Sequence, residues 1–222
     1  VAQALQSWSA FDFEARATAA GLVVAAVRSA QEWAEHPHSS ALRAQPLVRI
    51  TQTDADSPAA PRAWPTLAPD ALPLSGLRML DLTRILAGPV AARTLAAYGA
   101  EVLMINGPQL PNIESIADMS RGKRSALLDL KTPAGLAQLR QLLAGAHVFV
   151  QGYRPGSLQA LGLGVDEVAR LAPGIVHASL SAYGRSGPWA DKRGFDSLVQ
   201  TACGINLAEA QAFGAAEPRA LP

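Results

Sequence analysis

The sequence has little of several features that would point to particular classes of protein. It has one cysteine, Cys203, so no disulfide forms within the chain; this fits a reducing compartment, and we expect a cytoplasmic protein. Its longest uninterrupted apolar run, residues 22–27, falls far short of the roughly 20 residues that a membrane-spanning helix needs. No secretory signal opens the chain, and we expect no membrane partner.

The sequence also lacks an excess of charge of one sign. Its 222 residues carry a formal net charge of +1, and charged residues make up 17% of the chain. Bulk electrostatics therefore predicts no nucleic-acid partner, and any anion site has to come from a local cluster of basic side chains. The apolar content of 49% is typical of a globular chain that buries a core.

Composition divides the chain into three segments. Residues 1–50 predict a helix over 1–20, a short strand at 22–24, and a helix over 31–44 that Pro37 interrupts. Residues 51–73 contain five prolines and predict a linker. Because the chain opens on Val1 rather than Met, we expect an internal piece of a longer protein, in which residues 1–50 form a small α/β segment.

From Leu74 onward, predicted strands alternate with predicted helices. The strands are 77–82, 101–105, 125–130, 147–151 and 175–181, and the helices are 89–98, 133–144, 165–171 and 195–202. This alternation predicts an α/β fold, an open and mostly parallel sheet with helices on both faces.

Two common nucleotide-binding motifs are incomplete. A Walker loop ending at Gly122-Lys123 lacks its first glycine and its final Ser or Thr, because Ala117 and Arg124 stand there. The pair Gly162-x-Gly164 is followed by Glu167 in place of the third glycine of a dinucleotide fingerprint. The four histidines do not have the spacing of metal ligands, so we expect no metal.

Three loops with glycine or proline follow predicted strands, where open α/β sheets bind their ligands. They are residues 87–89, 152–156 and 184–188. Basic side chains gather in the same half of the chain: Arg121, Lys123, Arg124, Lys131, Arg154, Arg185, Lys192 and Arg193. This clustering is consistent with a phosphate-bearing ligand, and solvated surface charge explains it equally well.

Taken in order, these motifs resemble the class III CoA-transferases, the family of formyl-CoA transferase, carnitine CoA-transferase and α-methylacyl-CoA racemase. The matching stretches are Leu-Arg-Met-Leu-Asp-Leu-Thr at 77–83, Ala-Gly-Pro at 87–89, Gly-Ala-Glu-Val at 99–102, Arg-Gly-Lys-Arg-Ser at 121–125, Leu-Asp-Leu-Lys-Thr-Pro at 128–133, Tyr-Arg-Pro-Gly at 153–156 and Gly-Phe-Asp at 194–196. The resemblance implies a Rossmann-like CoA-binding domain over residues 74–222, truncated at its C-terminal end. It also suggests that residues 1–50 are the end of a preceding lobe. It also implies acyl-CoA as a substrate rather than a tightly bound cofactor.

The resemblance further implies which residues contact CoA. They are Ile85 and Leu86 beside the thioester, Lys123 and Arg124, Leu128 and Lys131 beside the adenosine, Gly152, Tyr153 and Arg154 along the CoA chain, and Gly194, Phe195 and Asp196. The residue types agree with this role, since flat adenine favours apolar strand edges and phosphates favour Lys and Arg.

The resemblance also implies a reaction. Family transferases attack the donor thioester with an aspartate and pass through an acyl-aspartyl anhydride and an aspartyl-CoA thioester before a carboxylic acid accepts the CoA. The position of that aspartate falls after Pro222, so we expect no catalytic residue in this chain and an inactive fragment. Asp196 is a poor substitute, because the second residue of a predicted helix caps or pairs locally. Phe195 stands where family racemases have a histidine, which disfavours racemase activity.

Other functions and the assembly stay open on sequence alone. A non-catalytic CoA-binding module explains the same residues, and a nicotinamide-dependent oxidoreductase is a weaker alternative. The family forms interlocked homodimers, and the resemblance implies the same for the full-length protein. The sequence indicates neither the acyl donor nor the acceptor.

Overall fold

The computed structural model describes residues 2–53, 60–110 and 114–218. The chain divides into two compact units, of which unit 1 comprises Val1–Ile50 with Ser181–Pro222 and unit 2 comprises Thr51–Leu180. The sequence predicted one domain from Leu74 to the end of the chain. In the structure, the residues after Leu180 pack with the first fifty residues instead.

Unit 2 is built on a five-stranded, all-parallel sheet in the order β3-β2-β1-β4-β5. The strands are β1 (Arg78–Leu82), β2 (Glu101–Asn106), β3 (Lys123–Leu127), β4 (Val148–Gln151) and β5 (Val176–Ser179). The order runs outward from β1 through β2 to β3 and, on the other side, from β4 to β5. The predicted α/β fold with a parallel sheet is therefore confirmed.

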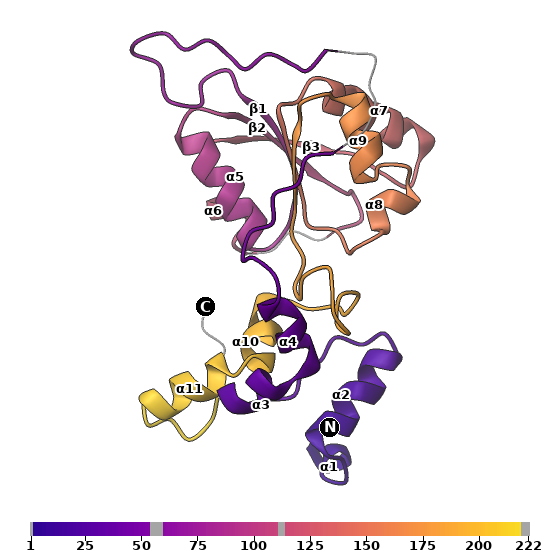
Figure 1. The fold of residues 1–222 in the computed structure, drawn as a ribbon, viewed down its shortest axis with the longest axis vertical. Coiled ribbons are helices and arrows are strands. Elements are labelled where there is room, and N and C mark those ends of the chain that lie inside the picture. Colours follow the sequence, from indigo (N-terminus) through magenta and orange to yellow (C-terminus); the bar gives the residue numbers. More distant parts are fainter. Residues whose placement is uncertain (1, 54–59, 111–113, 219–222) are drawn as a thin grey trace. The chain divides into compact units, whose positions relative to one another are not determined.

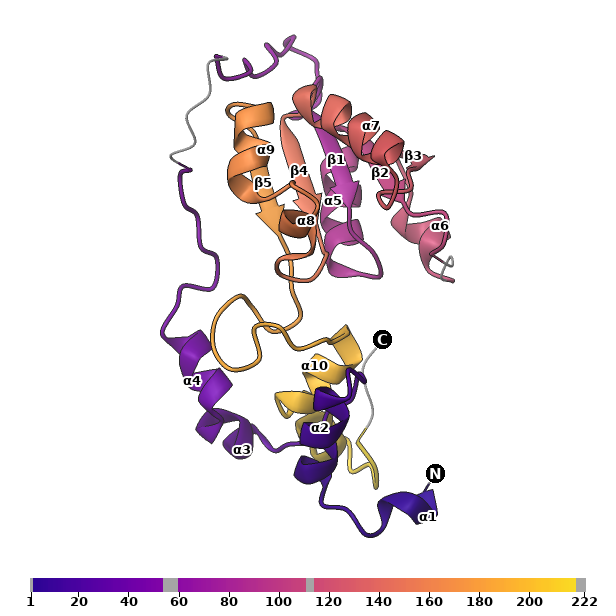
Figure 2. The same ribbon diagram turned by 90° about the vertical axis from the view of Figure 1, so that its right-hand side faces the viewer.

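Helices cover both faces of this sheet (Figures 1 and 2). On one face lie α7 (Pro133–Ala144), α8 (Ser157–Ala160) and α9 (Val165–Leu171), and on the other lies α5 (Ala87–Ala97), with the short α6 (Ile116–Met119) beside it. Parallel strands covered in this way carry apolar side chains on both faces, which explains the apolar sequences of the inner strands β2 and β4, whereas the edge strands β3 and β5 are more polar.

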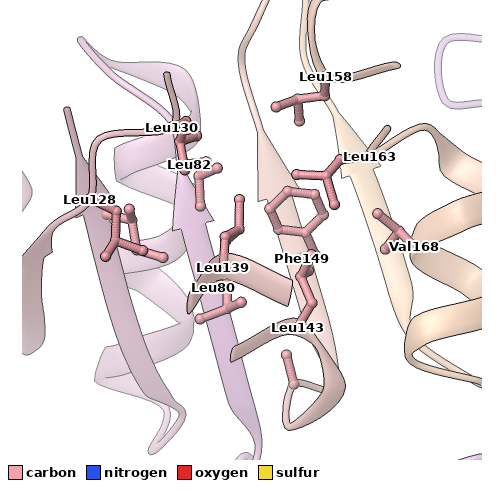
Figure 3. Close-up of a cluster of buried hydrophobic side chains, with 12 residues drawn as sticks. Leu80, Leu82, Leu128, Leu130, Leu139, Leu143, Phe149, Leu158, Leu163 and Val168 are labelled. Carbon is pink, nitrogen blue, oxygen red and sulfur yellow. The ribbon is translucent and has the colours of Figure 1, made fainter. Parts of the chain in front are cut away.

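Alternate residues of β1 enter two separate cores. Leu80 and Leu82 join the cluster beneath α7, α8 and α9, where Phe149 is fully buried (Figure 3). Met79 points to the opposite face and packs with Ala92 of α5. This alternation, which follows from the period of two residues in a strand, places the next residue on the α5 side, Asp81, in an apolar layer.

Unit 1 is helical in the described residues. Its helices are α1 (Ala2–Leu5), α2 (Ala10–Ala19), α3 (Ala30–Glu35), α4 (Pro37–Arg43), α10 (Asp196–Ala202) and α11 (Ile205–Ala212). Its two sequence segments are joined by polar contacts: the Arg28 amide donates to the Thr201 carbonyl at 3.2 Å, and His38 Nε2 lies 2.6 Å from the Tyr183 carbonyl oxygen. His38 is fully buried.

Three expectations about local structure need correction. The strand predicted at 22–24 is wrong: this stretch has no regular structure and no partner strand in the described part of unit 1. The predicted helix 1–20 is two helices, because Ser9 caps α2 by accepting from the Asp12 amide at 3.1 Å. The third strand ends at Leu127 rather than at 130, since the Asp129 carbonyl accepts from both the amide and the hydroxyl of Thr132 and turns the chain.

The helices that the structure describes are too short or too polar to cross a lipid bilayer.

Candidate functional site

The order of the strands reverses between β1 and β4, and in open α/β sheets ligands bind beside the carboxyl ends of the strands at this point. The loop with Ile85 and Leu86 follows β1, and the loop from Gly152 to Arg154 follows β4. The two loops are adjacent, since the Gly152 amide donates to the Leu82 carbonyl at 3.3 Å. The structure thus brings together five of the residues expected to contact CoA.

The loop after β4 is held by a buried glutamine. Gln151 Oε1 accepts from the Tyr153 amide at 2.8 Å, and Gln151 Nε2 donates to Ser179 Oγ of β5 at 2.9 Å. Both ends of one side-chain amide are therefore used to fix the backbone that carries Tyr153 and Arg154. The sequence analysis did not select Gln151, although a polar residue at the end of an apolar strand is a signal for such a role.

Tyr153 is half-buried and packs against the core beneath α7. Burial raises the pKa of its hydroxyl, and the positive charge of Arg84 acts in the opposite direction. Tyr153 therefore stays neutral at physiological pH and offers a hydrogen-bond donor at the edge of an apolar surface. Arg154, the next residue, is exposed.

The loop after β1 is anchored by a buried ion pair. Lys123 Nζ lies 2.8 Å from Asp81 Oδ2, and both side chains are fully buried. Asp81 Oδ1 accepts from the amide of Thr83 at 2.9 Å and from its hydroxyl at 2.5 Å. Lys123 Nζ also donates to the Pro89 carbonyl at 2.9 Å, which connects β1, β3 and the start of α5.

This pair changes the interpretation of one expected contact. The sequence analysis placed Lys123 among the side chains that bind CoA, but its ammonium is enclosed by Asp81 and Pro89, and a phosphate contact would require breaking the pair. The sequence analysis missed Asp81 as a site residue. A carboxylate flanked by Leu80 and Leu82 in a predicted strand was the available signal, because an isolated charge is rarely buried without a partner.

The residues expected beside the adenosine lie at and after the end of β3. Leu128 is buried in the core beneath α7, whereas its neighbour Leu127 is 68% exposed on the edge strand. Arg124 and Lys131 are exposed. The turn that carries Lys131 is fixed by Asp129 Oδ1, which accepts from the Lys131 amide at 3.0 Å. Leu127 is thus an apolar surface residue that the sequence analysis did not select.

Gly194, Phe195 and Asp196 belong to unit 1, whereas the other nine expected residues belong to unit 2. Gly194 packs against the Tyr183 ring, since a Cβ there would lie 2.7 Å from a ring carbon. Phe195 is 52% exposed. Asp196 begins α10, and its carboxylate accepts from Gln200 Nε2 at 2.6 Å, which agrees with the local pairing expected for it.

The exposed cations at this edge of the sheet are far apart. Lys131 follows β3 and Arg154 follows β4, and two strands lie between β3 and β4 in the sheet. With neighbouring strands about 4.8 Å apart, the two strand ends are separated by about 14 Å. A single ligand that contacts both side chains has to be long and negatively charged in more than one place. The described residues contain no cluster of three or more potential metal ligands.

Two glycines at the β1 and β4 ends make a matched pair for a test of packing. A Cβ on Gly88 would lie 2.3 Å from the Thr83 side chain, whereas a Cβ on Gly152 would lie 3.8 Å from the same residue. We expect Gly88→Ala to lower the free energy of unfolding by about 2–3 kcal/mol because it forces Thr83 off Asp81. Gly152→Ala should change it by less than about 0.5 kcal/mol. Urea denaturation of both variants measures the difference, and equal losses would contradict this account of the β1 loop.

Comparison with known proteins identifies the family. A sequence profile described as "CoA-transferase family III" matches residues 74–218, about two thirds of the chain. The chain belongs to CoA-transferase family III. The match covers every motif that carried the resemblance from residue 77 to residue 196.

Several curated relatives of this family member are named as transferases. It is 32% identical to an "Acyl-CoA transferase" of Gibberella moniliformis over 220 residues, covering 96% of this chain and 38% of that protein. It is 36% identical to the "Succinyl-CoA:glutarate CoA-transferase" of Mus musculus over 146 residues, covering 60% of this chain and 34% of that protein. The chain therefore spans about a third of the length of these relatives. The first match also extends to residues before 74.

Solved structures of the family share the fold. The crystal structure of Rv3272 from Mycobacterium tuberculosis, orthorhombic form, is 33% identical with a TM-score of 0.60, covering 68% of this chain and 44% of that one. A CAIB/BAIF family protein from Brucella suis is 32% identical with a TM-score of 0.55, covering 61% of this chain and 40% of that one.

Proposed function

We propose that the protein moves CoA from an acyl-CoA thioester to a carboxylic acid, and that this chain supplies CoA-binding residues. The proposal rests on the side chains that lie at the carboxyl edge of the unit 2 sheet. Exposed cations follow β3 and β4, and the half-buried apolar side chains of Ile85 and Leu86 follow β1 between them. CoA is long, anionic at its nucleotide end and thioester-bearing at the other, which suits this arrangement.

The residues divide by role along that ligand. We propose that Lys131, with exposed Leu127 and Arg124, contacts the nucleotide, and that Arg154 and the Tyr153 hydroxyl contact the pantetheine chain and the diphosphate that joins it to the nucleoside. Lys123 acts on the site through Asp81 rather than through the ligand. Gly194, Phe195 and Asp196 remain proposed substrate contacts of unit 1.

We further propose the covalent route of the family for the transfer itself. An aspartate carboxylate attacks the acyl carbon, CoA leaves as the thiolate, and that thiolate then attacks the aspartyl carbonyl and releases the donor acid. The acceptor carboxylate opens the resulting aspartyl thioester, and CoA returns to the acceptor's acyl group. Three aspartates at the proposed site already have structural partners: Asp81 pairs with Lys123, Asp129 with Gln109 and Asp196 with Gln200. In keeping with the resemblance to the family, we place the nucleophile outside the described residues, in a full-length protein that assembles as a homodimer.

Calorimetric titration with CoA tests the binding half of the proposal. We expect Lys131→Gln and Arg154→Gln each to weaken CoA binding about tenfold, which corresponds to about 1.4 kcal/mol for a lost charge-assisted contact. Arg49→Gln, which removes an exposed charge from unit 1, should leave the affinity unchanged. Lys131→Gln should not change the affinity for pantetheine, because pantetheine lacks the nucleotide. Equal weakening by all three variants would show only a response to net charge and would overturn these assignments.

A transfer assay separates a transferase from a module that binds CoA without turnover. Two relatives are named as succinyl-CoA:glutarate transferases, so succinyl-CoA and glutarate make a reasonable first pair of probes for the full-length protein. Hydroxylamine added during turnover should attack the aspartyl-CoA thioester, release CoA and leave an aspartyl hydroxamate that mass spectrometry detects. A protein that binds CoA but never gains this modification with any donor would favour the binding module.

A further inference from the structure

Ile85 has a backbone conformation that its side chain opposes. Its φ is +75°, and it is the sole residue other than glycine with positive φ in the described chain. The left-handed region is disfavoured for L-residues and most of all for β-branched side chains such as isoleucine. Residues in this state persist when the surrounding structure holds them there, and they are concentrated at functional sites.

The loop that contains Ile85 is held at both ends. At its start, Thr83 gives two hydrogen bonds to Asp81 Oδ1, one from its amide and one from its hydroxyl. At its end, Lys123 Nζ binds the Pro89 carbonyl of α5 while it pairs with Asp81. One buried ion pair therefore fixes the residues on either side of the strained position.

Close packing also holds Asp81 and Thr83 in place. Gly88 approaches the Thr83 side chain so closely that no Cβ fits, and Gly152 of the neighbouring loop also lies near Thr83. Thr83 and Asp81 are 3% and 0% exposed, whereas Ile85 and Leu86 are only partly buried. A rigid buried anchor thus carries a pair of apolar side chains at the surface.

We propose that Asp81 and Thr83, with Lys123 as the partner of Asp81, are positioning residues that hold Ile85 in its left-handed conformation and so fix the loop that meets the thioester end of CoA. The ligand in this statement rests on the proposed function, whereas the hold on Ile85 does not. The anchor supplies the free energy that the strained backbone requires. If glycine replaced Ile85, the conformation would be nearly free of strain and the anchor would no longer be needed for it.

A double-mutant cycle of Thr83→Val and Ile85→Gly tests this coupling. We expect Thr83→Val to weaken CoA binding about tenfold and to speed hydrogen exchange of amides 84–88 about tenfold, because the loop then leaves the conformation that Ile85 opposes. In the Ile85→Gly background, the same Thr83→Val change should alter each quantity less than about threefold. Effects of Thr83→Val that are equal in the two backgrounds would overturn the proposal.

Two further variants serve as controls for the double-mutant cycle. Thr83→Ser keeps the hydroxyl and should behave as the wild type, whereas Thr94→Val removes a hydroxyl that donates to Val90 on the exposed side of α5 and should not affect the loop. If Thr83→Val does not fold, the Ile85→Gly background still allows the comparison of Thr83→Val with Thr83→Ser. Hydrogen exchange is measured without CoA. A wild-type protein that binds no CoA would therefore contradict the proposed function. The double-mutant cycle of hydrogen-exchange rates would still test whether Thr83 holds Ile85 in its conformation.

Discussion

Glu14→Gln is expected to lower the free energy of unfolding of unit 1 by about 3–5 kcal/mol, the cost of leaving buried charges without their partner. Glu14 Oε1 accepts from Lys192 Nζ at 2.7 Å and from Arg28 Nη1 at 3.2 Å, and its second oxygen pairs with Arg28 Nη2. The three side chains are at most 6% exposed. Replacing the carboxylate with an amide leaves two buried cations facing a neutral group.

The surroundings of this cluster explain why it does not simply become solvated. Lys192 Nζ lies 3.7 Å from the centre of the Trp189 ring, and Arg28 Cζ lies 5.0 Å from the same ring. The aromatic face stabilises both cations, but a neutral ring does not replace the carboxylate. Because Glu14 comes from α2 and Lys192 from the segment before α10, the loss falls on the contact between the two halves of unit 1.

Tryptophan fluorescence during urea denaturation measures this effect within unit 1. Trp8, Trp33 and Trp189 belong to unit 1, and Trp64 belongs to unit 2. The matched control is Glu35→Gln, which removes an exposed carboxylate of the same segment that accepts from Gln31. A loss below about 1 kcal/mol for Glu14→Gln, or an equal loss for Glu35→Gln, would contradict the account of the cluster.

The same carboxylate makes stability depend on pH. Burial raises the pKa of Glu14, but the hydrogen bonds from Arg28 and Lys192 outweigh burial and hold the pKa below its usual value of 4.5. A carboxyl whose pKa is lower in the folded state stabilises the fold fully above its unfolded pKa and loses this contribution as pH falls through the folded one. The wild type should therefore lose stability below pH 4.5, and Glu14→Gln should show a flatter profile there.

Lys123→Met is expected to have a comparable effect on unit 2, about 3–5 kcal/mol, because the Asp81 carboxylate stays buried without its counter-ion. Methionine preserves the length and most of the volume of the side chain, so the change is mainly electrostatic. It also removes the bond to the Pro89 carbonyl, and the N-terminal end of α5 should loosen. Loss of ellipticity on urea denaturation and hydrogen exchange in α5 both measure the change.

Two variants make this test specific. Arg124→Met changes the next residue of β3, which is exposed, and should alter stability by less than about 0.5 kcal/mol. Asp81→Asn combined with Lys123→Met removes both charges, keeps an acceptor for Thr83, and should recover most of the loss. If the double variant is as unstable as Lys123→Met alone, the effect comes from packing rather than from an unpaired carboxylate.

Local signals predicted much of unit 2. The helix α7 begins where Thr132 accepts from the Gly135 amide at 3.1 Å, with Pro133 at its first position, and it ends before Gly145, as the sequence indicates. The inner strands β2 and β4 are short apolar runs whose burial the sequence indicates. Their boundaries shifted where a side chain turns the chain, as Asp129 does after β3.

Unit 1 could not be predicted in the same way. Its two segments meet through single polar groups far apart in sequence: the contact of His38 with Tyr183 spans 145 residues, and that of Glu14 with Lys192 spans 178. Periodicity carries no information about such pairs. The apolar run at 22–24 predicted a strand because a local pattern cannot show that no partner strand lies beside it.

The candidate site was predicted in part. The motifs placed Ile85, Leu86, Gly152, Tyr153 and Arg154 at adjacent loops because parallel strands end at a common edge. The residues that hold these loops, Asp81 and Gln151, escaped selection since their roles depend on partners in other strands. For the same reason the sequence could not distinguish the exposed Lys131 from the buried Lys123.

The central claim, that CoA binds at the carboxyl edge of the unit 2 sheet, is tested most directly by a crystal structure of the protein soaked with CoA. We predict density for the nucleotide beside Leu127 and Lys131 and for the pantetheine chain beside Tyr153 and Arg154, with the thiol near Ile85. Continuous CoA density elsewhere on the protein, with this edge empty, would contradict the claim.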